Sequence, residues 1–189
     1  MLFKFIHENY GGKRGFLHHV LVKIKYLLYR YTYIDDIPDS LIGYRIVFVC
    51  KGNICRSALA HCYLDSFQIT ETFSFGLETK SGLNAYDKIT SFSNEIGCYL
   101  AHHRTTSLSD YKFQNNDFIY CMEPSQCKQV KQLFPNAKVS LLGLELRPIR
   151  PFIQDPYEAD EEYIKTCIIL IVSAINSIKL KLSNHTDKC

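Results

Sequence analysis

The fold of this chain is decided by one stretch, RIVFVCKGNICRSALAHCYL, which runs from Arg45 to Leu64. Its first five residues form an apolar run typical of a buried strand, and SALAHCYLDSF (57–67) has the spacing of a helix. A turn of eight residues, Cys50 to Ser57, joins the two. A structural cysteine needs neither the Gly-Asn pair nor the arginine in this turn, so the sequence of the turn indicates chemistry.

The chain beyond this stretch continues to alternate between strands and helices. Further strands are expected at 72–76, 117–122 and 138–142, and helices at 86–97, 125–134 and 160–182. The alternation predicts an α/β fold, with a four-stranded parallel sheet and helices on both of its faces. Ligands in such folds bind at the carboxyl ends of the strands, where Cys50 is expected to lie.

Residues 1–44 differ from the rest, and we expect them to form a helical extension and linker ahead of one domain over residues 45–189. Residues 1–31 carry six Lys and Arg against one Glu, whereas residues 45–189 carry 16 Lys and Arg against 15 Asp and Glu. A basic amphipathic helix is predicted over residues 16–31, after a break at Gly-Gly-Lys-Arg-Gly. Three roles of this helix stay open: packing against the domain, peripheral contact with a membrane, or contact with a partner protein.

Composition narrows the class of protein. The net charge of +3, without a dense basic block in the domain, speaks against nucleic acid as a partner. No run reaches the roughly 18–20 uncharged apolar residues of a membrane span, and no signal peptide is expected. The eight cysteines are irregularly spaced, so we expect free thiols in the cytoplasm. The spacing of His61, His102 and His103 matches no zinc pattern, so no metal is expected.

The turn after Cys50 has the composition of an anion-binding loop. Its backbone N–H groups and the amino end of the following helix favour a bound oxyanion. Gly52 and Asn53 suit the positive φ angles of such a loop. Arg56 offers a planar fork that matches two phosphate oxygens, and Ser57 can donate a hydrogen bond to the sulfur. The same field stabilises a thiolate, so the loop is predicted to hold a tetrahedral oxyanion above a nucleophilic Cys50.

A phosphoryl-transfer site of this kind also needs an acid for the leaving group. The promising candidate is Asp155, in the Asp-Pro-Tyr run just before the last helix. Pro156 stiffens the loop and biases Asp155 toward an extended backbone. Tyr157 offers an aromatic face that can flank a substrate ring.

Together these residues resemble the low-molecular-weight protein tyrosine phosphatases. The resemblance covers residues 45–182 and rests on VFVCKGNICRS (47–57), SFG (74–76), HHR (102–104), DFIYCME (117–123), LLG (141–143) and DPY (155–157). It implies a four-stranded parallel sheet flanked by helices, and no metal or organic cofactor. The two outer motifs are the specific ones, because they occur in the right order about a hundred residues apart.

The resemblance also implies a role for each site residue. Cys50 is the expected nucleophile, which forms a cysteinyl-phosphate, and Asp155 is the expected acid and then base. Arg56 is expected to stabilise the transferred phosphoryl group. The substrate-binding set is expected to comprise Lys51, Gly52, Asn53, Ile54, Cys55, Ser57 and Tyr157. Asn53 would brace the loop with the help of His103, and Cys55 is a candidate for a protective disulfide with Cys50 under oxidation.

The expected substrate is a phosphotyrosine protein, and kinship with bacterial members suggests an autophosphorylated tyrosine kinase of polysaccharide export. Lys51 departs from the family pattern, in which an apolar or small residue is common. It leaves open a preference for acidic sequences. Two other functions stay as alternatives: an arsenate reductase of the same fold, for which Cys121 and Cys127 are relay candidates, and a noncatalytic phosphate-binding module.

Overall fold

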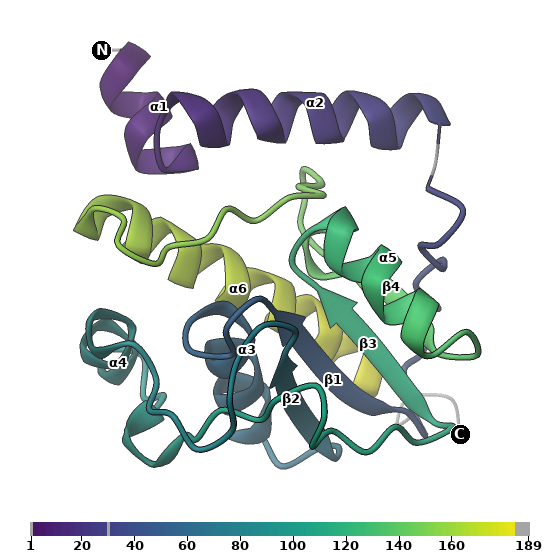
Figure 1. Ribbon diagram of the computed structural model, residues 1–189. Coiled ribbons are helices and arrows are strands. Elements are labelled where there is room, and N and C mark those ends of the chain that lie inside the picture. Colours follow the sequence, from purple (N-terminus) through teal and green to yellow (C-terminus); the bar gives the residue numbers. More distant parts are fainter. Residues whose placement is uncertain (1, 30, 184–189) are drawn as a thin grey trace.

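The computed structural model describes residues 2–29 and 31–183, and its centre is a parallel sheet (Figure 1). The strands are β1 (Arg45–Cys50), β2 (Thr72–Gly76), β3 (Asp117–Cys121) and β4 (Lys138–Leu141), in the order β2-β1-β3-β4. All pairings are parallel, so Cys50 at the end of β1 lies beside Gly76 at the end of β2. The predicted four-stranded parallel sheet is confirmed.

Helices cover both faces of the sheet because β1 is apolar on both sides. Ile46 and Phe48 pack with α3 (Arg56–Asp65), α4 (Asp87–Asn94) and α6 (Glu161–Ser183). Val47 and Val49 point the other way and pack with α5 (Pro124–Leu133). Every residue of β1 is buried, as expected of a central parallel strand.

The predicted helices agree with the structure except near their ends. The helix expected over 86–97 ends at Asn94, and the chain then turns through Gly97, whose φ is +73°. Helix α5 begins one residue earlier than expected, with Pro124 in the first turn, where the missing N–H of proline costs no hydrogen bond. Two short 3₁₀ turns, η1 (Leu100–His102) and η2 (Leu142–Leu144), follow α4 and β4.

The extension contains two helices, of which only one was expected. Helix α1 (Leu2–Tyr10) was missed, and α2 (Lys13–Tyr29) begins three residues before Phe16. The predicted break is real at Gly11 and Gly12, which have φ angles of +65° and +105°. Gly15, the third glycine of this run, lies within α2, and only glycine fits there because a Cβ would lie 1.8 Å from the carbonyl oxygen of Tyr10. The extension packs against the domain: α1 lies on α6, and α2 crosses above the domain (Figure 1).

Helix α6 is long and apolar enough to cross a membrane by length and hydropathy, and within residues 2–29 and 31–183 it alone is. Its residues at helical spacing, Ile164, Cys167, Ile171, Ile175 and Ile178, are fully buried, and they pack with α3 and one face of the sheet. We therefore describe α6 as a core helix of the domain.

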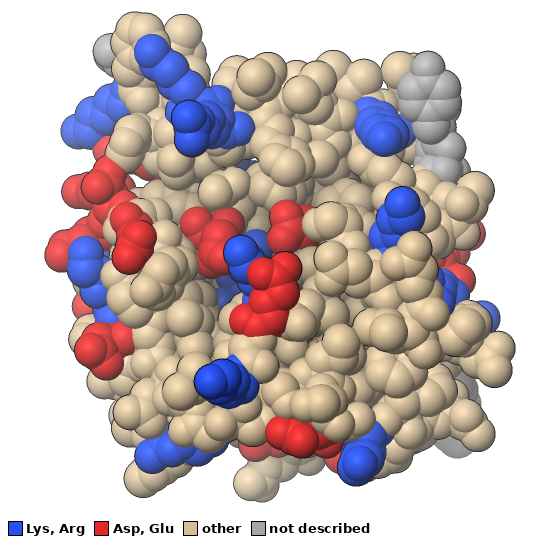
Figure 2. Space-filling view, viewed as in Figure 1, with Lys and Arg blue, Asp and Glu red and all other residues tan. Residues whose placement is uncertain are grey.

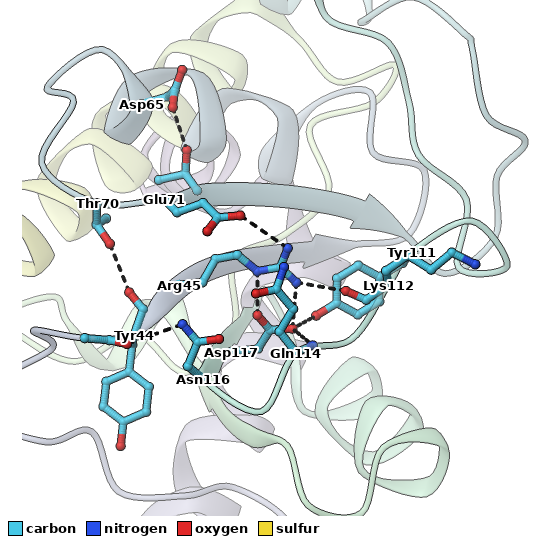
Figure 3. Close-up of polar contacts among 12 residues, drawn as sticks. Tyr44, Arg45, Asp65, Thr70, Glu71, Tyr111, Lys112, Gln114, Asn116 and Asp117 are labelled. Atoms are coloured by element: carbon cyan, nitrogen blue, oxygen red, sulfur yellow. Dashed lines mark hydrogen bonds and ion pairs between the residues drawn. The ribbon is translucent and has the colours of Figure 1, made fainter.

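A buried ion pair fixes the amino ends of the two central strands, at the end of the sheet opposite to Cys50 (Figure 3). Arg45 donates from Nε and Nη2 to the two carboxylate oxygens of Asp117, at 2.6 and 2.9 Å. Both side chains are almost completely buried. Tyr111 and the backbone N–H of Gln114 also donate to Asp117, and Glu71 lies 3.6 Å from Arg45 at the surface. This network ties the starts of β1 and β3 together.

The cysteines depart from expectation at one pair. Cys62 on α3 and Cys98 after α4 form a disulfide, with Cα atoms 6.0 Å apart, so the expectation of free thiols is wrong for these two. It is confirmed for five buried cysteines: Cys50, Cys55, Cys121, Cys127 and Cys167. Cys189 lies outside the described residues.

Candidate active site

Two polar groups contact the sulfur of Cys50 at the carboxyl end of β1, and a helix begins beside it. The Ser57 hydroxyl oxygen lies 3.0 Å from the sulfur, and the backbone N–H of Asn53 donates to it at 3.3 Å. Because the side-chain amide of Asn53 donates to Ser57 Oγ, the hydroxyl hydrogen of Ser57 is directed to the sulfur. The amino end of α3 follows immediately and has no side-chain cap. This arrangement stabilises negative charge on the sulfur.

Asn53 holds the loop in its shape. Its φ of +53° is in the left-handed region, which asparagine tolerates better than most residues. The side-chain amide donates to Ser57 and Ser74, and Oδ1 accepts from the backbone of Thr106. Its carbonyl oxygen lies 2.8 Å from Nε2 of His103, whose pKa is lowered by burial. The neutral ring can donate one hydrogen there, so the expected bracing by Asn53 and His103 is present in the geometry.

The backbone of the loop at Gly52 differs from the prediction. The expected positive φ is found at Asn53 and not at Gly52. The close backbone approach occurs instead at Gly76, the last residue of the SFG motif. A Cβ on Gly76 would lie 2.9 Å from the carbonyl carbon of Gly52 and 3.0 Å from the nitrogen of Asn53. Only a glycine in β2 lets the loop pack this closely.

Arg56 lies buried beneath the loop and connects it to the distant Asp155. Its Nη1 donates to the carbonyl of Ile153 at 2.9 Å, and Nη2 lies 2.8 Å from a carboxylate oxygen of Asp155. Burial opposes its charge, but the negative groups around it, first Asp155 and then Cys50, raise its pKa. The buried Nε has no hydrogen-bond partner among the described residues. A buried donor of this kind requires an acceptor, and a phosphate oxygen would supply one.

The groups predicted from the two ends of the domain meet at one cavity. It has a volume of about 260 Å³ and is lined by Cys50, Lys51, Gly52, Ile54, Cys55, Glu78, Asp155 and Tyr157. Asp155 also accepts a hydrogen bond from the backbone of Tyr157 at 3.3 Å. The structure thus brings the loop together with the Asp-Pro-Tyr run, about a hundred residues later.

Two residues of the rim were missed in the sequence. Glu78 lies 3.4 Å from Lys51, and both side chains are exposed, so the extra cation is paired at the mouth of the cavity. The ring of Tyr86 lies 5.1 Å from that of Tyr157 and supports it from outside the cavity. Neither residue belongs to a motif of the loop, so only the fold could reveal these contacts.

The other thiols of the site region are poor nucleophiles. Burial, and then the charges of Asp155 and Cys50, raise the pKa of Cys55 far above the ordinary thiol range. Burial also raises the pKa of Cys121, which is hydrogen-bonded to Cys127 on the α5 side of the sheet. The arsenate reductase hypothesis requires accessible, reactive thiols at Cys121 and Cys127. The burial of both therefore disfavours that hypothesis.

The extension contacts the segment that carries Asp155. His18 stacks on Phe152 with ring centroids 4.2 Å apart and an interplanar angle of 8°. Arg150 donates to the carbonyl of Asn9, and its guanidinium lies 4.4 Å from the ring centroid of Tyr10. Of the three roles left open for the extension, packing against the domain is therefore present, and it supports the loop of the candidate acid.

Within the described residues no group of three or more His, Cys, Asp or Glu is placed to hold a metal ion. His61, a candidate in the sequence, instead lies 3.1 Å from the hydroxyl of Ser74, below the loop. Burial lowers the pKa of His61 to about 4, so the ring is neutral near pH 7.

Comparison with known proteins identifies the family. The family model for low molecular weight phosphotyrosine protein phosphatase matches residues 45–187. A low molecular weight protein-tyrosine-phosphatase, Ptp of Acinetobacter johnsonii, is 28% identical over 131 residues, which are 69% of this chain and 92% of that protein.

Two solved structures give the same picture. The YwlE arginine phosphatase of Geobacillus stearothermophilus is 26% identical, with a TM-score of 0.65 over 74% of this chain and 93% of that one. The tyrosine phosphatase Wzb of Escherichia coli K30, in complex with sulphate, is 27% identical, with a TM-score of 0.62 over 72% and 97%. The chain therefore belongs to the low molecular weight phosphotyrosine protein phosphatase family.

Proposed function

We propose that this enzyme hydrolyses phosphotyrosine through a cysteinyl-phosphate on Cys50. The observation that carries the proposal is that Cys50 and Asp155 line one cavity, while the buried Arg56 forms an ion pair with Asp155 beside it. A nucleophilic sulfur, a forked cation and a carboxyl group are the three parts that phosphoryl transfer by this route requires. A noncatalytic phosphate-binding module needs neither the sulfur nor the carboxyl group.

The first chemical step forms the S–P bond. The thiolate of Cys50 attacks phosphorus, and the bond between phosphorus and the tyrosine oxygen breaks. Arg56 and the loop amides, from Lys51 to Arg56, bind the three equatorial oxygens. Asp155, in its protonated form, gives its proton to the departing phenolate.

The second step returns the enzyme to its starting state. The carboxylate of Asp155 takes a proton from a water molecule, which attacks the phosphorus of the cysteinyl-phosphate. The S–P bond breaks, inorganic phosphate leaves, and the hydroxyl of Ser57 stabilises the thiolate that forms on Cys50. No metal or organic cofactor enters either step.

The aromatic wall supports an aryl ester as the substrate. Tyr157 lines the cavity, is 49% exposed, and is supported by Tyr86. A phenyl ring above the loop would pack along its face. Phosphoarginine is the appropriate comparison substrate, because one of the similar structures is an arginine phosphatase.

The experiment that tests this function combines turnover with trapping of the intermediate. Wild type should hydrolyse p-nitrophenyl phosphate and phosphotyrosine peptides faster than phosphoarginine, and acid quenching should recover phosphate bound to Cys50. Cys50→Ser should lose all turnover. It should still bind vanadate, but less tightly than wild type does. Asp155→Ala should keep a burst with p-nitrophenyl phosphate and lose phenyl phosphate turnover. Phosphate binding without turnover in wild type would establish a binding module. Thiol-coupled reduction of arsenate would establish an arsenate reductase.

We further propose a cytoplasmic enzyme whose protein substrate is an autophosphorylated tyrosine kinase of polysaccharide export. Five buried free cysteines, Cys50 among them, support the compartment, and the Cys62–Cys98 disulfide is the feature that runs against it. Membership of this family, with bacterial relatives such as Ptp, supports the substrate class. Cys50→Ser protein, mixed with phosphorylated cytoplasmic proteins, should retain a tyrosine-phosphorylated kinase that vanadate releases. Retention of other phosphoproteins only would contradict this substrate.

A further inference from the structure

Helix α2 carries an apolar stripe that is largely exposed. Leu17, Leu21, Ile24 and Leu28 are 59%, 58%, 49% and 69% exposed. Their spacing of four, three and four residues places them on one side of the helix. Helix α6 behaves in the opposite way, because its residues at similar spacing are buried in the core. Leu17 and Leu21 also line an open groove between α2 and the start of α5, so part of the stripe borders the domain and the rest faces solvent.

The inner side of α2 explains why the helix can stay in place with its stripe exposed. Gly15, His19 and Val22 face the domain and are buried. His19 lies 5.1 Å from the ring of Tyr10, and burial, with the charge of Arg150 next, lowers its pKa to about 4. His18 stacks on Phe152 at the edge of the same contact. Packing against the domain thus uses one side of α2 and leaves the aliphatic side free.

Basic side chains flank the stripe. Arg14 and Lys25 are exposed, and the helical spacing places both along one border of the stripe. The ammonium group of Lys13 lies 4.8 Å from the ring centroid of Phe3, which is 68% exposed. In Figure 2, basic side chains gather over α1 and the start of α2 and near the other end of α2, with uncharged surface between them.

We propose that the outer side of α2, which we call the α2 stripe (Leu17, Leu21, Ile24 and Leu28), lies on the surface of an anionic lipid bilayer. The stripe spans twelve residues, or about 17 Å of helix, and its side chains are aliphatic. Such a surface, bordered by Lys and Arg, inserts shallowly between lipid headgroups while the cations meet anionic phosphates.

Charge favours this occupant over a second copy of the chain. Residues 1–31 carry six Lys and Arg against one Glu, so two such faces would repel each other. An anionic bilayer instead gains from every cation near its surface, by about a fivefold change in affinity for each.

The test measures co-sedimentation of the full chain with vesicles. Wild type should bind vesicles that contain phosphatidylglycerol in phosphatidylcholine, bind pure phosphatidylcholine vesicles weakly, and be released by salt. The double variant Leu21→Gln, Ile24→Gln should lose binding at least tenfold. The matched control is Leu180→Gln, Ile169→Gln on α6, where both side chains are 63% exposed, and it should bind like wild type. All three proteins should hydrolyse p-nitrophenyl phosphate equally, which shows that they are folded.

Several outcomes would overturn the proposal. Absence of vesicle binding, equal binding to neutral and anionic vesicles, or unchanged binding of the stripe variant would each do so. Sedimentation velocity provides a further check: a dimer of wild type that the stripe variant abolishes would assign the stripe to a contact between copies of the chain. Binding to a protein partner alone, with no vesicle binding, would also refute it.

Discussion

The guanidinium of Arg56 donates to the Ile153 carbonyl and pairs with Asp155, so it positions the proposed acid in addition to its proposed role in binding phosphate. Arg56→Lys keeps the charge but loses the fork, and we expect kcat to fall at least about a hundredfold. Steady-state hydrolysis of p-nitrophenyl phosphate measures the effect. Arg147→Lys is the control, at an exposed arginine whose side chain, within the described part of the chain, bonds only backbone carbonyls. Near-normal turnover in Arg56→Lys would contradict the bidentate picture.

His61 makes stability depend on pH. Burial, despite an opposing effect of Asp65, lowers its pKa to about 4, whereas the unfolded chain has a value near 6.5. Between these values the unfolded state binds more protons, so His61 reduces stability as the pH falls from about 6.5 toward 4. The fall in Tm between pH 7 and pH 5 should therefore be smaller by a few degrees in His61→Gln, which keeps a partner for Ser74.

The control for this measurement is His102→Gln, at an exposed position of η1. It should show the same fall in Tm as wild type. An unchanged fall in His61→Gln would mean that protonation of His61 does not limit stability in acid.

At the scale of elements, α2 supports the segment that carries Asp155. His18→Ala removes the ring that stacks on Phe152, while His18 is exposed and its loss should not unfold the chain. We expect turnover of phenyl phosphate, whose leaving group needs an acid, to fall several-fold, and turnover of p-nitrophenyl phosphate to change little. Lys25→Ala, on the same helix, should alter neither rate. Equal loss with both substrates would indicate a general defect in the site.

How far the sequence predicts these elements depends on whether their signal is local. The strand and helix of the phosphate loop carry an uninterrupted apolar pattern and a specific motif, so both were predicted to within one or two residues. Helix α1 was missed because its nine residues precede two glycines and bury only Ile6. Glu78 and Tyr86 were missed because their contacts, with Lys51 and Tyr157, exist only after the chain has folded.

At the scale of the whole molecule, β1 connects two buried polar clusters, one at its amino end and the other at its carboxyl end. Its first residue, Arg45, pairs with Asp117, and its last, Cys50, begins the phosphate loop. Hydrogen bonds of the Asp117 carboxylate raise the pKa of Arg45, which therefore stays charged although it is buried. We therefore expect the two ends of this strand to contribute separately, one to stability and the other to the proposed chemistry.

The two acidic partners of Arg45 allow this separation to be tested. Asp117→Ala leaves a buried cation without its partner, and we expect the free energy of unfolding to fall by about 3–5 kcal/mol. Glu71→Ala removes the exposed partner of the same guanidinium and should cost less than about 1 kcal/mol. Urea denaturation measures both. Folded Asp117→Ala protein should retain the KM of wild type for p-nitrophenyl phosphate, because the phosphate loop lies at the far edge. Equal destabilisation by the two variants, or a large rise in KM, would refute this division of roles along β1.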